Sequence, residues 1–430
     1  MQADSKIYVA GHTGLVGSAI LRALKAHGYK NIITKNFQDL DLTRQAQVES
    51  FFQETRPEYV FLAAAKVGGI WANNTQKADF IYDNLMISAN VISASHKFGV
   101  KKLLNLGSSC IYPKNAPQPL KEEYLLSGLL EPTNEAYAIA KISALKLCRY
   151  FNEQYGTNFI SVMPTNLYGP NDNFNLETAH VLPAMIRKFH LAKLLSEKDF
   201  VGIRSDFKKF GLPQNCCSNI RLLPKPGASP MGDGSTSSPR ARLPDALILS
   251  LSKDRPAVPG VATTCPSELP ERSGKGEAWE PVEGCECKKI SIDKISDSEI
   301  VELLAKFGIT AQTLNLWGTG SVYREFLHVD DLASALIFLM NKYNFADLSE
   351  CINIGVGTDL RISELAQLIK KIVGFTGEIK FDHASSDGTP RKLLDISKIS
   401  KLGWSANIPL DLGIKNTYEW CCACFEESVL

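Results

Sequence analysis

Residues 11–17 read Gly-His-Thr-Gly-Leu-Val-Gly, a glycine-rich run with the spacing G-x-x-G-x-x-G. The run follows an apolar segment at 6–10 and precedes an amphipathic pattern that ends near Gly28. This order predicts a buried strand, a tight turn and a helix. Glycines in such a turn let the backbone approach a pyrophosphate, and the helix N-terminus adds N–H donors and partial positive charge. The run therefore predicts a dinucleotide-binding βαβ unit; a glycine-rich turn without a ligand is the alternative interpretation.

Strand-like and helix-like segments alternate along the chain after this run. Strands are predicted at 31–34, 58–64, 101–107 and 158–164. Helices are predicted at 43–55, 79–98 and 135–155, and a further helix–strand section at 331–395. This alternation is typical of α/β proteins with a doubly wound parallel sheet, so we expect a Rossmann domain over 1–170, to which later segments return. We expect 171–211 and 287–430 to form mainly a smaller C-terminal α/β substrate domain.

Residues 212–286 interrupt the pattern. They hold 11 of the 21 prolines and show no hydrophobic period. A segment of this composition cannot offset its ordering entropy by burial, so we predict a disordered, low-complexity insertion rich in Pro, Gly and Ser. Helices are predicted on either side of it, at 197–210 and 297–307.

Charge and cysteine usage limit the kinds of partner. Lys+Arg (47) and Asp+Glu (46) leave a net charge of +1, which argues against nucleic-acid and anionic-membrane binding. No apolar run reaches the roughly 18 residues of a membrane span, and no signal peptide is evident. The 11 scattered cysteines fit reduced thiols. Cys285, Cys287 and the C-terminal run at 421–424 lack further ligands, so we expect no metal. The absence of a membrane span and of a signal peptide favours a cytoplasmic location.

The end of the second predicted strand bears on the choice between NAD and NADP. An acidic residue there would bond the ribose 2′-OH of NAD. Here the chain reads Thr34-Lys35-Asn36-Phe37, with no acid before Asp39. Lys35 is available for a 2′-phosphate, which favours NADP(H); a solvated strand end is the alternative.

Tyr137 and Lys141 have the i, i+4 spacing of two side chains on one helix face. An ammonium beside a phenol is expected to lower the phenol's pKa and make it a usable acid or base. Such a pair also occurs by chance, but Ser108 follows a predicted strand whose carboxyl end is where ligands of open α/β sheets bind. Ser108, Tyr137 and Lys141 together predict a proton-transfer set for a carbonyl group beside a nicotinamide.

These motifs resemble the extended short-chain dehydrogenase/reductase superfamily, and longer runs resemble the GDP-L-fucose synthase family within it. The runs lie at 63–70, 73–74, 106–113, 131–135, 163–170, 324–331 and 387–392. The resemblance covers about residues 1–195 and 312–420. It implies a homodimer that uses NADPH to convert GDP-4-keto-6-deoxy-D-mannose to GDP-L-fucose, by 3,5-epimerisation followed by 4-keto reduction.

The resemblance also implies roles for individual residues. Cys110 would be the base and His180 the acid of epimerisation, acting with Ser108, Tyr137 and Lys141. Taken alone, Cys110 reads as a small buried thiol and His180 as a helix-start residue. The implied substrate contacts are Lys188, Trp317, Arg324 and Asp387. The implied cofactor contacts are Gly11, His12, Thr13, Gly14, Leu15, Val16, Gly17, Lys35, Leu106, Gly107, Lys141, Pro164, Asn166, Leu167 and His180.

The chain departs from the family pattern at Thr13 and Phe37, where enteric bacterial members carry arginines near the 2′-phosphate, and in its insertion. Two alternatives remain open. One is another nucleotide-sugar epimerase or reductase of the superfamily; a dehydratase would place an Asp-Glu pair where Ser109-Cys110 stands. The other is a non-catalytic dinucleotide-binding protein disabled by the insertion, against which Ser108, Cys110 and the other predicted catalytic residues are retained.

Overall fold

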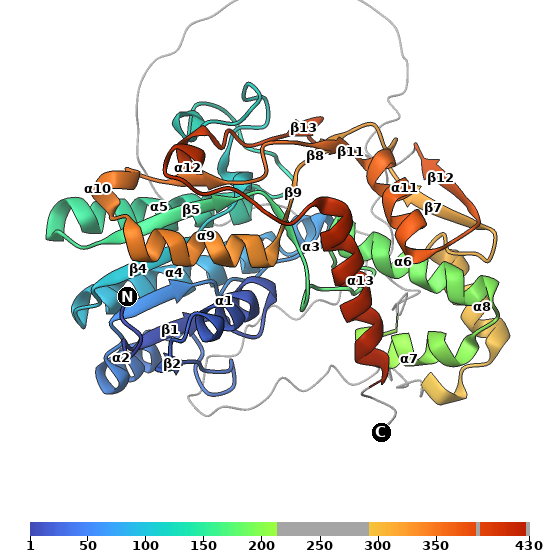
Figure 1. Ribbon diagram of the computed structural model, residues 1–430, viewed down its shortest axis with the longest axis horizontal. Coiled ribbons are helices and arrows are strands. Elements are labelled where there is room, and N and C mark those ends of the chain that lie inside the picture. Colours follow the sequence, from blue (N-terminus) through green and yellow to red (C-terminus); the bar gives the residue numbers. More distant parts are fainter. Residues whose placement is uncertain (213–291, 384–387, 427–430) are drawn as a thin grey trace, which may run out of the picture. The chain divides into compact units, whose positions relative to one another are not determined.

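The computed structural model describes residues 1–212, 292–383 and 388–426 (Figure 1). These residues belong to one compact unit that spans Met1–Gln214 and Ile290–Leu430. The predicted insertion lies outside the described residues except for Leu212, as do Cys285, Cys287 and Asp387.

The central sheet has six parallel strands in the order β10-β5-β4-β3-β1-β2. The strands are β1 (Ile7–Ala10), β2 (Ile32–Ile33), β3 (Tyr59–Leu62), β4 (Lys102–Leu106), β5 (Phe159–Pro164) and β10 (Ile352–Ile354). The strand order reverses at β1, which has β2 on one side and β3 on the other. In open α/β sheets, ligands bind outside the carboxyl ends of the strands at such a point.

Helices cover both faces of this sheet. Successive residues of a strand point to opposite faces, so Ile7 and Val9 join one hydrophobic cluster while Tyr8 and Ala10 join another. The first cluster packs against α1 (Leu15–Ala26) and α9 (Val329–Lys342), which contact each other (Figure 1). The second packs against α2 (Gln45–Thr55), α4 (Lys77–Lys97) and α5 (Glu135–Tyr155). The sheet is therefore buried on both sides, as a doubly wound fold requires.

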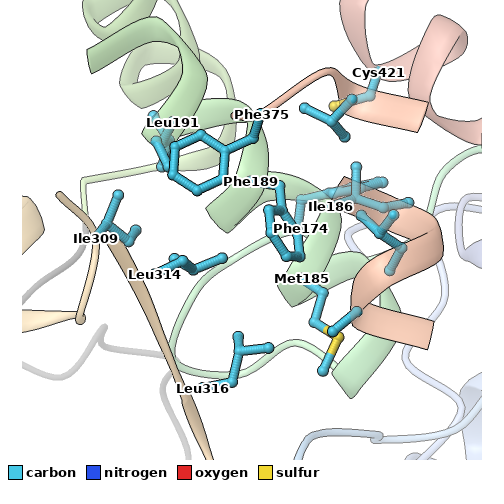
Figure 2. Close-up of a cluster of buried hydrophobic side chains, with 14 of the residues drawn as sticks. Phe174, Met185, Ile186, Phe189, Leu191, Ile309, Leu314, Leu316, Phe375 and Cys421 are labelled. Atoms are coloured by element: carbon cyan, nitrogen blue, oxygen red, sulfur yellow. The ribbon is translucent and has the colours of Figure 1, made fainter. Parts of the chain in front are cut away.

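A separate hydrophobic core surrounds α6 (Val181–Ser196), where Phe189 and Ile186 are fully buried (Figure 2). A two-stranded parallel sheet packs against it, formed by β7 (Thr313–Trp317) and β12 (Glu378–Asp382). The helices that complete this core are α7 (Phe200–Phe210), α8 (Asp297–Lys306), α11 (Ile362–Val373) and α13 (Leu410–Glu426).

Short strands lie between these parts and carry several of the predicted site residues. In one pair, β6 (Asn166–Tyr168) runs parallel to β9 (Phe326–His328). In the other group, β8 (Tyr323–Arg324) lies between β11 (Leu360–Arg361) and β13 (Arg391–Lys392). The remaining elements are α3 (Ile70–Thr75), α10 (Phe345–Leu348), α12 (Ser397–Lys401), η1 (Ser109–Ile111), η2 (Glu122–Tyr124) and η3 (Ile292–Lys294).

The predicted elements of the Rossmann part are confirmed with small changes at their ends. The helix predicted at 135–155 is α5, which Gly156 ends in the left-handed region at φ 66°. The strand predicted at 31–34 is shorter, at Ile32–Ile33. No described helix is long and apolar enough to cross a membrane. Among the described residues, no group of three or more His, Cys, Asp or Glu side chains is placed to hold a metal ion.

Candidate functional site

The glycine-rich run forms the turn between β1 and α1. Gly11 has φ +81°, and a Cβ added to it would lie 2.8 Å from the backbone of Ala64. A Cβ added to Gly17 would lie 2.0 Å from the carbonyl oxygen of Gly11, so the helix can approach the turn only without a side chain there. Gly14 caps α1 without any side-chain hydrogen bond, which leaves the first N–H groups of the helix for another acceptor. The turn thus fits a pyrophosphate.

The predicted cofactor contacts also include His12 and Lys35, which follows the end of β2. His12 Nδ1 is buried and has no hydrogen-bond partner in the described structure. Thr13, Lys35 and Phe37 are exposed. The Lys35 ammonium is therefore available to a 2′-phosphate, whereas Thr13 and Phe37 offer no charge.

Leu106 and Gly107 lie at the carboxyl end of β4. A Cβ at Gly107 would lie 2.3 Å from the sulfur of Met163, so this glycine allows β4 and β5 to pack closely. Lys141 Nζ donates a hydrogen bond of 2.8 Å to the carbonyl oxygen of Leu106. On the neighbouring segment, Pro164 ends β5, and Asn166 and Leu167 begin β6. These predicted cofactor contacts therefore share one edge of the sheet.

Tyr137 and Lys141 lie on one face of α5, as expected. The Lys141 Nζ lies 5.7 Å from the centroid of the Tyr137 ring, and the side chain is 5% exposed. Burial lowers the pKa of Lys141 to about 8. Burial also raises the pKa of Tyr137, and the nearby Cys110 adds to this increase. The expected lowering of the Tyr137 pKa is therefore wrong for this structure, because burial disfavours the charged phenolate.

Ser108 and Cys110 lie in the turn that follows β4. Ser108 Oγ caps η1 by accepting a hydrogen bond of 3.3 Å from the Cys110 N–H. Cys110 is buried, with 7% exposure. Burial raises the pKa of its thiol, and Lys392, the Ser108 hydroxyl and Lys141 oppose this increase. The thiol is consequently protonated near neutral pH.

His180 occupies the N-cap position of α6, without a side-chain capping hydrogen bond. Desolvation by the surrounding protein lowers the pKa of its imidazole, and the Lys392 ammonium lowers it further. Near neutral pH the site therefore holds an uncharged imidazole together with the uncharged Cys110 thiol.

Lys392 is the charged neighbour that Cys110 and His180 share, and no motif in the sequence predicts a role for it. It lies in β13, paired with Arg324 of β8. Burial lowers its pKa, and the Cys110 thiol opposes this shift. The run at 387–392 contained the signal for Lys392, but only the pairing of β13 with β8 brings it to the two predicted epimerisation residues.

Lys188 and Trp317 meet at the edge of the α6 core. Lys188 Nζ donates a hydrogen bond of 3.1 Å to the Phe307 carbonyl and lies 5.8 Å from the centroid of the Trp317 indole. Burial lowers the pKa of Lys188 to about 8. The Trp317 side chain is 72% exposed, so its ring can stack on a ligand. A cation beside an exposed aromatic face suits a phosphate attached to a planar base.

The predicted residues thus form two groups among the described part of the chain. Ser108, Cys110, Tyr137 and Lys141 lie at the carboxyl ends of β4 and β5, where the charge of Lys392 acts on both Cys110 and His180. Lys188 and Trp317 form the second group. Arg324 lies beside Lys392, between the elements that carry the two groups. Asp387 lies outside the described residues, so its predicted sugar contact stays a prediction.

Known proteins similar to this chain belong to one family of nucleotide-sugar enzymes. The NAD dependent epimerase/dehydratase family matches residues 7–205 and 292–355. The chain is similar to GDP-L-fucose synthase 1 of Arabidopsis thaliana, at 42% identity over 97% of this chain and 93% of that protein. It is similar to GDP-L-fucose synthase of Escherichia coli (strain K12), at 38% identity over 96% of each. A solved structure of a GDP-mannoheptose C4 reductase from Campylobacter jejuni with NADP bound matches with TM-score 0.71 and 38% identity, over 98% of this chain and 99% of that one.

Proposed function

The chain belongs to the NAD dependent epimerase/dehydratase family, and on this premise we propose that it is a GDP-L-fucose synthase. It would convert GDP-4-keto-6-deoxy-D-mannose to GDP-L-fucose with NADPH, by 3,5-epimerisation followed by 4-keto reduction. The two curated relatives named above, at 38% and 42% identity over nearly the whole chain, support this substrate.

The observation that carries the proposal is the placement of two proton-transfer sets at one edge of the sheet. Tyr137 and Lys141 form a set suited to carbonyl reduction. Cys110 and His180 form a second set, which a reductase alone does not need, and both groups face Lys392. Epimerisation next to a ketone requires one group that removes a proton and another that returns one to the opposite face.

NADP(H) fits the residues of the first strand–turn–helix. The turn at Gly11, Gly14 and Gly17 and the uncapped start of α1 would hold the pyrophosphate. Lys35 would meet the 2′-phosphate, and Leu106, Pro164 and the Asn166–Leu167 segment would line the nicotinamide. When bound, the cofactor supplies a hydride to C4 of the sugar. The NADP bound to the Campylobacter reductase supports this choice.

The protein's own groups would handle the protons. Cys110 would first pass its proton through solvent to the neutral imidazole of His180. The resulting thiolate, which the Lys392 ammonium favours, would then remove a proton at C3 or C5. His180 delivers a proton from the other face, while Ser108 and Tyr137 donate hydrogen bonds to the C4 oxygen, where enolate charge develops. In the reduction Tyr137 gives its proton to that oxygen, and its raised pKa keeps the proton in place beforehand.

The nucleotide would lie across the second group of residues. Trp317 offers its exposed indole to the guanine, and Lys188 and Arg324 offer charge to the diphosphate. Asp387 would contact the sugar or ribose. We place this substrate part mainly in 171–211 and 287–430, and the NADP part in 1–170.

The test follows NADPH absorbance after GDP-4-keto-6-deoxy-mannose is added to the full chain in D₂O, with the product identified by mass and NMR. GDP-L-fucose carrying deuterium at C3 and C5 is the expected product. Oxidation of NADPH without this exchange would instead assign a GDP-sugar C4 reductase. No oxidation despite NADPH binding would favour the disabled dinucleotide-binding protein.

Two variants separate the steps. Cys110→Ser is expected to slow deuterium exchange while NADPH binding stays unchanged. Tyr137→Phe is expected to slow NADPH oxidation about 10²- to 10⁴-fold while exchange persists. Normal exchange in the first variant, or normal oxidation in the second, would contradict the role proposed for that residue.

We also propose a cytoplasmic homodimer without nucleic-acid or membrane partners. In support, Tyr82 on α4 is 62% exposed and Tyr150 on α5 is 53% exposed, and these two helices pack on each other. Exposed tyrosines are common in protein interfaces. Light scattering on the purified chain should give twice the 47.3 kDa monomer mass, and Tyr82→Lys with Tyr150→Lys should give the monomer.

A further inference from the structure

Glu325 is a buried carboxylate at the junction of the two groups of site residues. Its side chain is 0% exposed. Oε1 accepts hydrogen bonds from the Val356 N–H at 2.6 Å and the Gly357 N–H at 2.7 Å. Oε2 accepts one from the Leu394 N–H at 3.1 Å. The carboxylate therefore ties the segment after β10 to the segment after β13.

The backbone of Glu325 ties a third segment to the same point. Its carbonyl oxygen accepts hydrogen bonds from Asn166 Nδ2 at 2.8 Å and from Thr165 Oγ1 at 3.3 Å. Thr165 and Asn166 join β5 to β6, on the side of the site where the nicotinamide is proposed to lie. The neighbouring Phe326 pairs with Asn166 in the β6–β9 ladder.

The residues around these contacts are those proposed to act on the sugar nucleotide. Arg324 precedes Glu325 and pairs with Lys392 between β8 and β13. Leu394, which the carboxylate holds, follows Lys392 by two residues. The place of Lys392 beside Cys110 and His180 thus depends on the strand end that Glu325 anchors.

The Glu325 carboxylate is closely packed and removed from water. A Cβ at Gly355 would lie 2.4 Å from Glu325 Oε1, so a glycine is needed there. Burial raises the pKa of Glu325, while its hydrogen bonds with Gly357, Leu394, Thr165 and Val356 oppose that increase. Unsatisfied buried carboxylates are strongly unfavourable, so the three N–H donors hold this side chain in one position.

We propose that Glu325 is a positioning residue that sets the sugar-nucleotide segment, Arg324 with β13, against the nicotinamide segment at Thr165 and Asn166. It acts through these residues and touches no reacting atom. The inference rests on the proposed function for the identity of the two ligands. It adds that the distance between them is set by one buried side chain.

Glu325→Gln is the sharpest test, because it changes one acceptor into a donor at almost constant shape. The remaining oxygen can keep the Val356 and Gly357 donors, while the new NH₂ group faces the Leu394 N–H. Hydrogen exchange followed by mass spectrometry should then show faster exchange at 392–396 and unchanged exchange at 356–358. Loss of the hydrogen bond to Leu394 should misplace β13. We therefore expect KM for the keto-sugar nucleotide to rise and kcat to fall, each about tenfold, with the Kd for NADPH unchanged.

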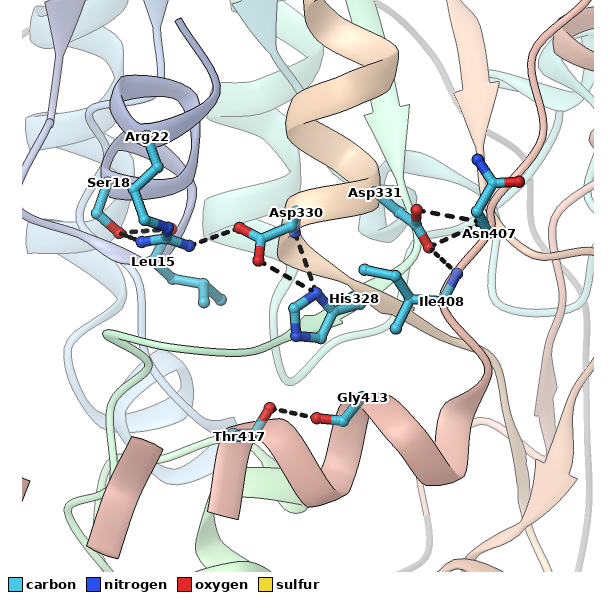
Figure 3. A network of polar contacts seen from close by, with 10 residues as sticks. All are labelled: Leu15, Ser18, Arg22, His328, Asp330, Asp331, Asn407, Ile408, Gly413 and Thr417. Atoms are coloured by element: carbon cyan, nitrogen blue, oxygen red, sulfur yellow. Dashed lines mark hydrogen bonds and ion pairs between the residues drawn. The ribbon is translucent and has the colours of Figure 1, made fainter. Parts of the chain in front are cut away.

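Asp331→Asn is the matched control (Figure 3). Asp331 is another buried carboxylate held by backbone donors, at 3.1 Å from the Asn407 N–H and 2.9 Å from the Ile408 N–H, but it contacts none of the proposed site residues. It should lose stability with KM and kcat unchanged. Glu325→Asp, which keeps the charge and shortens the reach, should show a smaller change than Glu325→Gln and replaces it if Glu325→Gln does not fold.

Two outcomes would overturn the proposal. One is a Glu325 variant that exchanges hydrogen like the parent chain at 392–396. The other is a variant that loses stability as Asp331→Asn does and keeps KM and kcat. Exchange at 392–396 and the affinity for GDP, which should weaken about tenfold in Glu325→Gln, are measured without turnover. They test Glu325 even if the parent chain fails to form GDP-L-fucose, which would contradict the proposed function alone.

Discussion

Tyr137 and Lys141 lie one helical turn apart, and burial shifts their pKa values in opposite directions. Desolvation penalises whichever form carries charge, so it favours the neutral phenol and the neutral amine. The Leu106 carbonyl accepts a hydrogen bond from Lys141 Nζ, which directs this ammonium to the backbone as well as to the ring. At the residue scale, the acid–base behaviour of the site is therefore set by how much protein surrounds each group.

The pKa of Lys141 leads to a prediction about pH. With a pKa of about 8, Lys141 carries its charge below that pH and loses it above. The single-turnover rate of NADPH oxidation is therefore expected to fall as the pH rises through about 8, because the cation beside Tyr137 is lost. A rate that stays flat up to pH 9.5 would contradict this. Lys141→Arg, slower overall, should show no fall, because a guanidinium stays charged.

Lys392 provides a second prediction at this scale. Its ammonium is the first among the charges that lower the pKa of the Cys110 thiol, and it also lowers the pKa of His180. In Lys392→Gln the thiol pKa should therefore rise. The measurement is the rate of alkylation of Cys110 by iodoacetamide against pH, followed on its peptide by mass spectrometry. Lys392→Arg should keep the parent dependence of the alkylation rate on pH. The same dependence in Lys392→Gln would contradict the proposed effect of Lys392 on the Cys110 pKa.

At the scale of the elements, a buried ion pair joins α6 to α7. Arg187 and Asp206 are 0% exposed, and the Arg187 Nε donates to Asp206 Oδ1 at 2.8 Å. Arg187 also donates to the carbonyls of Phe174, Phe210 and Gly211. The guanidinium therefore donates hydrogen bonds to carbonyls at the C-terminal end of α7, which have no donor within the helix.

Removing Arg187 should be costly for this reason. Arg187→Met leaves a buried carboxylate without its cation, so we expect a loss of about 3–5 kcal/mol in the free energy of unfolding in urea. The matched control is the pair of Arg22 and Asp330, at 2.6 Å with 42% and 43% exposed side chains (Figure 3). Arg22→Ala should cost less than about 1 kcal/mol, since exposed ion pairs contribute little. Equal losses in the two variants would contradict the argument.

At the scale of the whole molecule, the described segments on either side of the insertion pack into one core. Phe207 of α7 and Ile300 of α8 belong to the cluster around α6. Arg204 Nη2 donates to the Ile295 carbonyl at 2.8 Å and to Asp297 Oδ1 at 2.6 Å. Direct contacts therefore join α7 to α8, independently of residues 213–291.

Replacing residues 213–291 with a short Gly-Ser linker should consequently leave the protein intact. Loop-closure entropy grows slowly with length, and the contacts of Arg204 remain, so we expect the melting temperature to change by only a few degrees. Affinity for NADPH should be unchanged. A large rise in melting temperature on deletion would show instead that the insertion strains the folded chain. The keto-sugar assay on both forms would then show whether it disables the site.

Local sequence determined the secondary structure and the spacing of the first motifs. The glycine spacing at 11–17, the helix at 135–155 and the one-turn separation of Tyr137 and Lys141 depend on interactions within a few residues, so they are readable without the fold. The turn proposed to hold the cofactor and the proposed reductase set can be predicted for this reason, and the family resemblance implies Cys110 and His180.

Tertiary structure alone decided which groups meet and what they experience. Lys392 comes to Cys110 across more than 280 residues of chain, through the pairing of β13 with β8. Glu325 joins three segments that no local pattern relates, and burial reverses the pKa shift expected for Tyr137. Desolvation and long-range contact depend on the packing of the whole chain, so neither can be read from residues that are neighbours only in sequence.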